Sequence, residues 1–263
     1  MASHQRRRRM TILKRADAEG IAHLTLNMPE KLNALSDAMI ARFHALLDKI
    51  ADDPTVKVVI VSGAGKAFCA GHDLGEMRAK DAEALKDLFD RCAALMLAIH
   101  ALPQPIIAQV HGIATAAGCQ LVATCDLAVA AEDTRFGVNG VNIGLFCSTP
   151  MVALTRNIGR KAAFEMLTTG RFISAEEAVT MGLVNKAVPP DMLQQKTREL
   201  AAMIAAKRTA AVKLGKETFY RQADMDVASA YEFAGDAMVR NMAIPDTQEG
   251  IAAFLEKRAP KWD

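Results

Sequence analysis

The sequence predicts an α/β domain followed by a helical C-terminal third. Up to about Pro150, short apolar runs of β-strand character alternate with longer segments of helical periodicity, which is the pattern of strand–helix crossover units. After Pro150 only helical segments are expected, and glycine or proline residues separate the earlier ones. A length of 263 residues and a hydrophobic fraction of 51% allow one large domain, or one domain with a helical appendage.

Four segments before Pro150 have the pattern of strands. Ile21–Asn27 alternates between apolar and polar residues, as a half-buried strand does. Val56–Ser62 is a continuous β-branched run of the kind that is buried on both faces of a parallel sheet. Ile106–Val110 and Leu127–Ala130 are shorter apolar runs, and they complete the strands expected in this half.

Three segments between these strands are predicted to be helices. Ser36 is a good N-cap for the first, since its side-chain oxygen can accept from a free backbone N–H. Ala82–Ala101 is amphipathic and ends before Pro103, and Ala116–Thr124 is the third helix. The apolar residues on one face of the first helix are Met39, Ile40, Phe43, Leu46, Leu47 and Ile50.

The C-terminal third is predicted to form helices that pack on a neighbouring subunit, because apolar residues occupy more than one face after Met192. We divide the chain into a basic, disordered arm over residues 1–9, an α/β core over 10–190 and a helical oligomerisation region over 191–263. The predicted helices are Lys161–Thr169, Ala175–Met181, Met192–Ala206, Ala210–Gln222, Asp226–Asn241 and Thr247–Lys257.

Charge and hydropathy exclude two kinds of partner. The chain has 32 Lys and Arg against 30 Asp and Glu, and Arg6–Arg9 supply four of the positive charges. Residues 10–263 therefore have a net charge of −2, so the main domain has no basic field for nucleic acid. No stretch approaches an apolar transmembrane run. We expect no nucleic-acid partner and no membrane span.

The five cysteines are expected to be buried, reduced thiols. They form no CxxC pair and have no accompanying histidine spacing, so no metal site is predicted. Their apolar surroundings favour a reducing compartment. No secretory signal is present, since no apolar segment follows the arginine run, although that run could be part of a mitochondrial presequence. We expect a cytoplasmic protein if the source is bacterial and a mitochondrial-matrix protein if it is eukaryotic.

Two glycine-marked segments give the clearest functional signal. They are Ala67–Met77 and Ile113–Gln120, and each follows a short apolar run. Glycine permits close approach and unusual dihedrals, so such turns can leave backbone N–H groups free to point into a shared pocket. Two convergent N–H donors form an oxyanion hole, which stabilises charge developing on a carbonyl oxygen.

The order and spacing of these segments give the chain a family resemblance. With its motifs, the sequence over residues 10–262 resembles the crotonase superfamily, the enoyl-CoA hydratase/isomerase group. Where it departs from the usual pattern of this family, the sequence is similar to the hydratase-domain-containing branch, which lacks a catalytic glutamate pair. The matching motifs are Phe68-Cys69-Ala70-Gly71-His72-Asp73-Leu74, Ala116-Ala117-Gly118-Cys119, Cys125-Asp126-Leu127, Pro29–Leu35, Gly182–Asn185 and Glu249–Arg258.

The resemblance implies a crotonase-type spiral of ββα turns and a helical C-terminal trimerisation region, in a homotrimer or a dimer of trimers. It implies a lyase or isomerase of fatty acid metabolism that acts on an acyl-CoA thioester, with CoA as part of the substrate and no separate cofactor. The backbone N–H groups of His72 and Ala117 would form the oxyanion hole. The residues expected to border the substrate are Lys31, Leu32, Ala34, Ala70, His72, Asp73, Leu74, Phe254 and Lys257.

Two positions depart from the pattern that the resemblance implies. Enoyl-CoA hydratases use two glutamates to hold and activate water, and Gln120 and Gly140 stand at those positions. Glutamine does not take up a proton in the working pH range, and glycine has no side chain. Each general acid–base step is worth about 10²–10⁴-fold, so efficient hydration by the usual route is not expected. Gln120 could still position a water by hydrogen bonding.

Other side chains near these motifs have two interpretations each. His72 could act as an acid or base, or its side chain could cap the neighbouring loop. Asp73 and Glu76 are expected at a helix N-terminus, where carboxylates are favourable. Cys119 and Cys147 invite a nucleophile hypothesis, but neither has a matched base in the sequence, and we expect both to pack in the core.

Three functions remain open from the sequence. The favoured one is a crotonase-type enzyme that stabilises a thioester enolate without the glutamate pair, for example in decarboxylation, double-bond isomerisation or thioester hydrolysis. The second is an enoyl-CoA hydratase despite both substitutions. The third is a non-catalytic acyl-CoA-binding or regulatory protein that kept the fold and the pocket.

Overall fold

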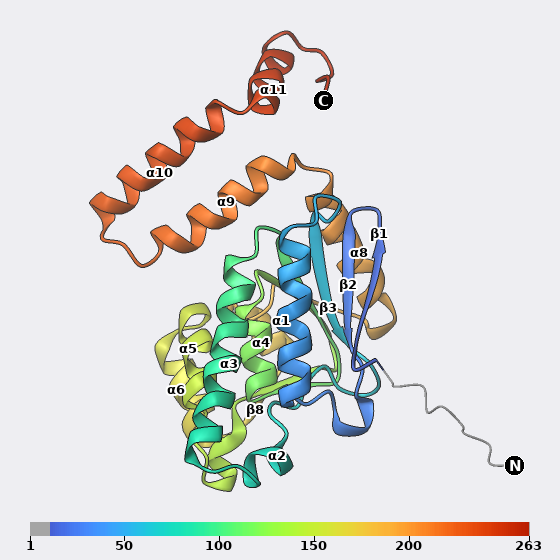
Figure 1. The fold of residues 1–263 in the computed structure, drawn as a ribbon, viewed down its shortest axis with the longest axis vertical. Coiled ribbons are helices and arrows are strands. Elements are labelled where there is room, and N and C mark those ends of the chain that lie inside the picture. The colour runs from blue at the N-terminus through green and yellow to red at the C-terminus, as the bar shows by residue number, and fades with distance from the viewer. Residues whose placement is uncertain (1–10, 263) are drawn as a thin grey trace, which may run out of the picture.

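The computed structural model describes residues 11–262, so the predicted basic arm over residues 1–9 lies outside the described residues. The main sheet is six-stranded, with the order β1-β2-β3-β4-β6-β9 (Figure 1). Only β1 runs antiparallel to its neighbour, and the remaining pairs are parallel. The strands are β1 (Leu13–Ala18), β2 (Ile21–Leu26), β3 (Val58–Gly63), β4 (Ile106–Val110), β6 (Leu127–Ala131) and β9 (Lys186–Val188).

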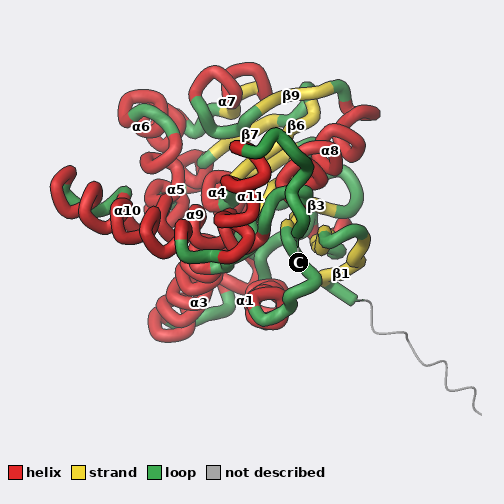
Figure 2. The backbone as a smooth tube through the Cα atoms, turned by 90° about the horizontal axis from the view of Figure 1, so that it is seen from above, coloured by secondary structure: helices red, strands yellow, loops and turns green. Residues whose placement is uncertain are grey.

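Helices cover both faces of this sheet (Figure 2). On one face α1 (Asp37–Ala51), α3 (Ala82–Ala101) and α4 (Ala117–Thr124) bury the larger core. The Ser36 side chain caps α1 by accepting from the Met39 N–H, as predicted. On the other face α8 (Leu193–Ala205) packs on β2, β3, β4 and β6, although it lies within the predicted oligomerisation region.

A second, three-stranded sheet has the order β5-β7-β8, and small helical elements surround it. Its strands are β5 (Ile113–Thr115), β7 (Arg135–Gly137) and β8 (Phe172–Ser174). The other elements are the 3₁₀ turns η1 (Pro29–Lys31), η2 (Asn139–Ile143) and η3 (Pro190–Met192) and the helices α2 (Leu74–Arg78), α5 (Ser148–Asn157), α6 (Arg160–Thr169) and α7 (Ala175–Met181).

The last three helices form an arm that stands apart from the body in Figure 1. They are α9 (Thr209–Gln222), α10 (Val227–Met242) and α11 (Pro245–Leu255). Lys216 is the buried residue of α9, and its ammonium contacts the Asp126 carboxylate at 2.7 Å and the carbonyl oxygens of Ile99 and Gln104. Large apolar side chains on the arm are exposed: Phe219, Val227, Tyr231, Met238, Val239, Phe254 and Leu255.

The predicted fold class is confirmed: an α/β body precedes a helical C-terminal region. Several details differ from the sequence prediction, and before Pro150 the strands β1, β5 and β7 were not predicted. The segment after Pro150 also contains the short strands β8 and β9, and β9 extends the main sheet. A helix that was not predicted, α5, includes Pro150 in its first turn, where a missing N–H leaves no hydrogen bond unmade.

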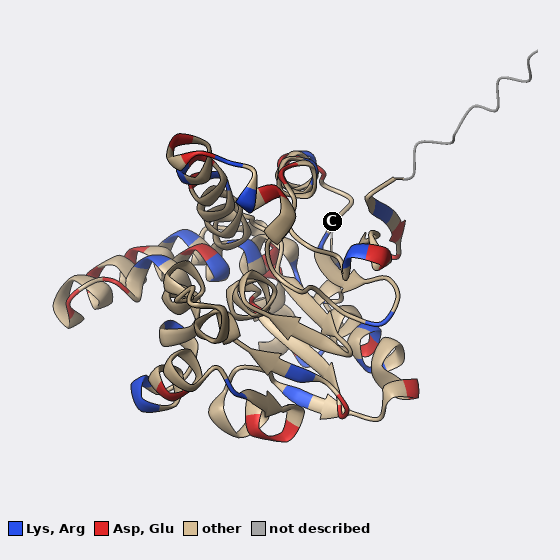
Figure 3. Ribbon diagram, turned by 90° about the horizontal axis from the view of Figure 1, so that it is seen from below, with Lys and Arg blue, Asp and Glu red and all other residues tan. Residues whose placement is uncertain are grey.

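The surface agrees with the mixed charge of the sequence. In the view from below, Lys and Arg are interspersed with Asp and Glu around the helices, and the strands are largely uncharged (Figure 3). Within residues 11–262, no helix is long and apolar enough to cross a membrane.

Candidate active site

The two glycine-marked segments lie side by side at the ends of β3 and β4. Cys69 and Ala114 form an isolated parallel bridge, in which the Cys69 N–H donates to the Ile113 carbonyl at 3.2 Å and the Thr115 N–H donates to the Cys69 carbonyl at 3.0 Å. The parallel pairing of β3 with β4 places both following loops at the same edge of the sheet. The sequence therefore predicted this meeting of segments correctly.

Close packing at two glycines holds these segments together. A Cβ placed on Gly118 would lie 2.1 Å from the Cys69 carbonyl oxygen, which no side chain could tolerate without a backbone shift. A Cβ on Gly71, whose φ is +91°, would lie 2.9 Å from the Ala116 Cβ and 3.2 Å from the Ala117 nitrogen. The backbone of Gly71 and His72 therefore approaches the first turn of α4 closely.

Two backbone N–H groups at this junction are free. Ala117 is the first residue of α4, so its N–H has no acceptor within the helix. Across residues 11–262, neither the Ala117 N–H nor the His72 N–H donates a hydrogen bond. Ala116, which precedes α4, has φ +49° and ψ −122°, a strained conformation for a residue with a Cβ. Such strain persists only where the surrounding structure enforces it, and it is common at functional sites.

The His72 side chain is half-buried, with one ring nitrogen paired and the other unpaired. Nδ1 lies 3.2 Å from the Leu35 carbonyl oxygen, so the side chain bonds to the neighbouring loop, which was one of its two predicted roles. Nε2 is buried and has no partner among the described residues. The edge of the ring meets Phe89 of α3, with centroids 5.7 Å apart. Burial lowers the pKa of this imidazole from its usual value of 6.5.

Gln120 lies one turn into α4 and is buried, also with an unpaired side-chain atom. Its exposed fraction is 5%, and its Oε1 has no hydrogen-bond partner within residues 11–262. A buried polar atom without a partner costs about 1–3 kcal/mol. Of five such side-chain atoms in the described part of the chain, two belong to His72 and Gln120. These two residues and the two free N–H groups come from the same pair of segments.

Gly140, in η2, faces its own loop. The Leu145 N–H donates to the Gly140 carbonyl at 3.0 Å, which closes the loop. A Cβ on Gly140 would lie 2.2 Å from the Leu145 carbonyl oxygen and 3.0 Å from the Cys147 sulfur. The backbone therefore fills the space from which a side chain would start. Neither a carboxylate nor any other side chain could be placed at this position without moving the loop.

The predicted CoA-bordering residues near the start of the chain lie on two adjacent segments. The loop of η1 runs alongside residues 70–73: the Ala70 N–H donates to the Leu32 carbonyl at 3.0 Å, and the Leu35 N–H donates to the Gly71 carbonyl at 2.7 Å. The Lys31 ammonium contacts the Asp73 carboxylate at 2.6 Å. Ala34 is buried in this loop, and Leu74 is exposed at the start of α2.

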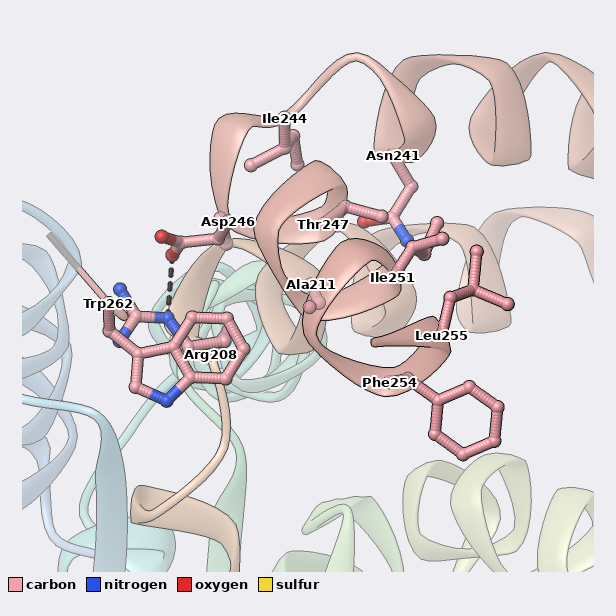
Figure 4. Close-up of a pocket in the computed structure, with 12 residues that line it drawn as sticks. Arg208, Ala211, Asn241, Ile244, Asp246, Thr247, Ile251, Phe254, Leu255 and Trp262 are labelled. Atoms are coloured by element: carbon pink, nitrogen blue, oxygen red, sulfur yellow. Dashed lines mark hydrogen bonds and ion pairs between the residues drawn. The ribbon is translucent and has the colours of Figure 1, made fainter. Parts of the chain in front are cut away.

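The remaining predicted residues of this group, Phe254 and Lys257, lie elsewhere. They belong to α11 and the turn after it, at the opposite end of the molecule from α2 in Figure 1. Phe254 is 83% exposed and lines a separate pocket of about 380 Å³ with Ile251 and Leu255 (Figure 4). Within one chain they do not join the other site residues.

Several side chains near the motifs have structural roles, as predicted. Asp73 caps α2 by accepting from the N–H groups of Gly75 and Glu76. The Glu76 carboxylate accepts from the Asp37 N–H at 3.0 Å, which ties α2 to the start of α1. Cys119 is buried, and burial raises the pKa of its thiol to about 12, which makes it a poor nucleophile. Cys147 is buried as well.

Two residues of the site were missed from the sequence: Leu35, whose carbonyl oxygen holds the His72 ring, and Phe89, whose ring it meets. A backbone acceptor gives no signal in sequence. Phe89 lies on the predicted amphipathic helix over residues 82–101, but nothing in its spacing separates it from an ordinary packing residue.

Comparison with known proteins gives consistent matches along almost the whole chain. The family model for enoyl-CoA hydratase/isomerase matches residues 16–263. The mitochondrial enoyl-CoA hydratase domain-containing protein 3 of Homo sapiens is 47% identical over 247 residues, which are 93% of this chain and 81% of that protein. The crotonyl-CoA hydratase of Syntrophomonas wolfei is 34% identical and covers 91% of this chain and 93% of its own length.

Two solved structures share the fold closely. The enoyl-CoA hydratase of Mycobacterium smegmatis superposes with a TM-score of 0.94 and 55% identity, covering 96% of this chain and 99% of that one. Human enoyl-CoA hydratase domain-containing protein 3 superposes with a TM-score of 0.93 and 45% identity, covering 96% of this chain and all of that one.

Proposed function

Because the chain belongs to the enoyl-CoA hydratase/isomerase family, we propose that it binds an acyl-CoA thioester and stabilises the enolate in a backbone oxyanion hole. The donors would be the N–H groups of His72 and Ala117. One observation carries this proposal: both N–H groups lack acceptors among residues 11–262, and the contact of Gly71 with the Ala117 nitrogen brings their segments together.

The chemistry of a thioester fits two such donors. When a proton or CO₂ leaves the α-carbon, the bonding electron pair stays behind and negative charge develops on the thioester oxygen. Donors that are already oriented stabilise that charge without reorganising, and each is worth about 3 kcal/mol by comparison with measured losses. The donors here are backbone groups held by glycine contacts, so their position does not depend on a mobile side chain.

The proposed activity is not efficient hydration by the two-glutamate route. Gln120 cannot exchange a proton, and the loop backbone fills the space beside Gly140. Proton transfer, decarboxylation or thioester hydrolysis at the same hole are the reactions that this arrangement supports. Hydration stays the second enzymatic alternative, because several relatives are named as hydratases.

A non-catalytic acyl-CoA-binding or regulatory protein is the alternative from another class. The observation that favours it is the absence of a carboxylate at both 120 and 140. The buried, unpaired Nε2 of His72 favours an enzyme instead, because it is a titratable group at the proposed hole. Turnover of a CoA thioester would support the enzyme, and binding of a CoA thioester without turnover would support the binding protein.

The CoA part of the substrate would lie along the η1 loop and residues 70–74, with Lys31 near its phosphates. Phe254 and Lys257 would reach this CoA only from a second copy of the chain, since α11 lies at the far end of its own molecule (Figure 1). The exposed apolar side chains of the arm support such an assembly. We propose a homotrimer or a dimer of trimers, located in the mitochondrial matrix if the source is eukaryotic and in the cytoplasm if it is bacterial.

The test is a paired measurement on purified wild-type protein. Crotonyl-CoA binding is measured by calorimetry, and hydration is followed by loss of the conjugated thioester absorbance. We expect binding with hydration below about 1 s⁻¹, the low end of ordinary enzymes. Hydration above that rate would contradict the proposed loss of the glutamate route. Absence of binding to any CoA thioester would contradict the proposal as a whole.

A further inference from the structure

The His72 imidazole has the hydrogen bonds of a neutral base whose reactive nitrogen is uncommitted. A carbonyl oxygen can only accept, so the Nδ1 atom that lies 3.2 Å from the Leu35 oxygen carries the ring proton. In the neutral ring, Nε2 then holds the lone pair. This fixed tautomer is the arrangement that a general base needs, with one nitrogen oriented by the protein and the other available.

No acidic group occupies Nε2. The Asp37 carboxylate of α1 acts electrostatically on the ring, and its two oxygens are engaged by Arg91 at 2.8 Å and Lys80 at 2.6 Å. Glu76 of α2 is bonded to the Asp37 N–H. From α3 the ring packs against the apolar Phe89 ring in a T-shaped contact. Burial therefore keeps the imidazole neutral, and its Nε2 lacks a partner among the described residues.

The position of this nitrogen relative to the proposed hole follows from covalent structure. The imidazole and the N–H that would hold the thioester oxygen belong to the same residue, so Nε2 lies within one side-chain length of that N–H. The carbon next to the thioester carbonyl is the atom whose proton becomes acidic when the oxygen is held. A lone pair within this reach of the proposed hole is a group that can take such a proton.

We infer that the His72 imidazole is the proton-transfer group of this site, so that its substrates are acyl-CoA thioesters with a removable α-proton. Nε2 takes that proton, the C–H electron pair forms the carbon–carbon double bond of the enolate, and the thioester oxygen takes the negative charge. The imidazolium then returns the proton to the α-carbon, or to the γ-carbon when a β,γ double bond makes a dienolate. The inference rests on the proposed function, and it needs no carboxylate at 120 or 140.

The test is exchange of α-protons in D₂O, measured by mass spectrometry on butanoyl-CoA, with binding of the same thioester measured by calorimetry. His72→Ala removes the imidazole and keeps the backbone N–H. His72→Gln keeps a donor for the Leu35 carbonyl and fills the space, which guards against misfolding of the first variant. His44→Ala is the matched control, because His44 is a histidine on α1, 38% exposed, that pairs with Asp48.

We expect the wild type and His44→Ala to exchange the α-protons at the same rate. Both His72 variants should bind butanoyl-CoA with at most a few-fold change and lose exchange by about 100-fold or more, the range of general acid–base steps. Exchange at the wild-type rate in either folded His72 variant would overturn the inference. Wild-type binding without exchange would overturn it too, while leaving the oxyanion hole in place. Absence of thioester binding would instead defeat the proposed function.

Discussion

The two sides of the candidate site differ in what fills them. On one side, which we call the packed side, residues 69–73 and 113–120 are held in close contact at two glycines, and the residues of α4 are buried. On the other side, which we call the loop side, residues 142–146 are exposed, and the Leu145 N–H closes the loop by donating to the Gly140 carbonyl. The first side offers free backbone N–H groups, whereas the second offers no side chain at the position where the family resemblance implies a glutamate.

This difference shows which parts of such a site tolerate sequence change. Backbone donors depend on packing, so they are kept as long as the glycines and their contacts are kept. Side-chain acids depend on single residues, and this chain keeps the fold with Gln120 and Gly140 at the positions where the family resemblance implies them. We therefore expect such a chain to keep the proposed binding and polarisation of a thioester even where it lacks the groups that activate water.

The largest effect is expected on the packed side. Gly118→Ala would force a Cβ to within 2.1 Å of the Cys69 carbonyl oxygen, with buried backbone on both sides. We expect a loss of about 3 kcal/mol in the free energy of unfolding, the upper part of the range for overpacking. Urea denaturation measures it, and an unchanged midpoint would show that the segments are not held by this contact.

The next effect concerns the neutral imidazole of the packed side. Burial lowers the pKa of His72, so as the pH falls below about 6.5 the unfolded chain takes up a proton that the folded chain does not. This difference lowers stability toward acid by at most about 1.4 kcal/mol per pH unit, until the folded pKa is passed. Between pH 7 and pH 5 the wild type should lose more stability than His72→Gln. If urea denaturation showed that the wild type and His72→Gln lose the same free energy of unfolding, a neutral His72 ring in the folded protein would be contradicted.

A smaller effect is expected on the loop side. Gly140→Ala places a Cβ 2.2 Å from the Leu145 carbonyl oxygen, a clash nearly as close as the one at Gly118. Because the loop that follows is exposed and can shift, we expect a cost of about 1 kcal/mol, the lower end of the overpacking range. Urea denaturation measures this cost as well. If Gly118→Ala and Gly140→Ala lost the same free energy of unfolding, the proposed contrast between the two sides would be wrong.

The smallest effect is expected for Gln120→Glu. The new carboxyl would be buried without a cation beside it, so its pKa should be raised. One restored glutamate does not supply the second, and we expect crotonyl-CoA hydration to change by less than about ten-fold. A larger gain in the hydration rate from this single substitution would mean that the missing side chain at Gly140 does not limit hydration.

Much of the fold was predictable from the sequence, and the reasons are local. The helix Ala82–Ala101 and the strand Ile106–Val110 have the predicted bounds, because Pro103 and Pro105 punctuate the chain between them. The strand Lys186–Val188 was missed since three residues carry no periodicity, and pairing with β6 alone makes them a strand. Helix α5 was missed because Pro150 suggested a break, although it lies in the first turn.

The site was predictable only where it depends on sequence motifs. The positions of His72 and Ala117 followed from the family resemblance, and the glycine pattern indicated that their segments meet. The pairing of Nδ1 with the Leu35 carbonyl could not be predicted, because any backbone carbonyl nearby would look the same in sequence. The closure of the loop on Gly140 is likewise a tertiary contact between backbone atoms.

Removal of one backbone donor tests the central claim most directly. The double change Ala116→Gly with Ala117→Pro deletes the Ala117 N–H at the first position of α4, where proline is tolerated once the residue before it has no Cβ. Ala116→Gly alone is the control, because it keeps the Ala117 N–H. With circular dichroism confirming folding, α-proton exchange in butanoyl-CoA should be about 100-fold or more slower in the double variant than in Ala116→Gly. Equal exchange in the folded double variant and in Ala116→Gly would contradict the oxyanion hole.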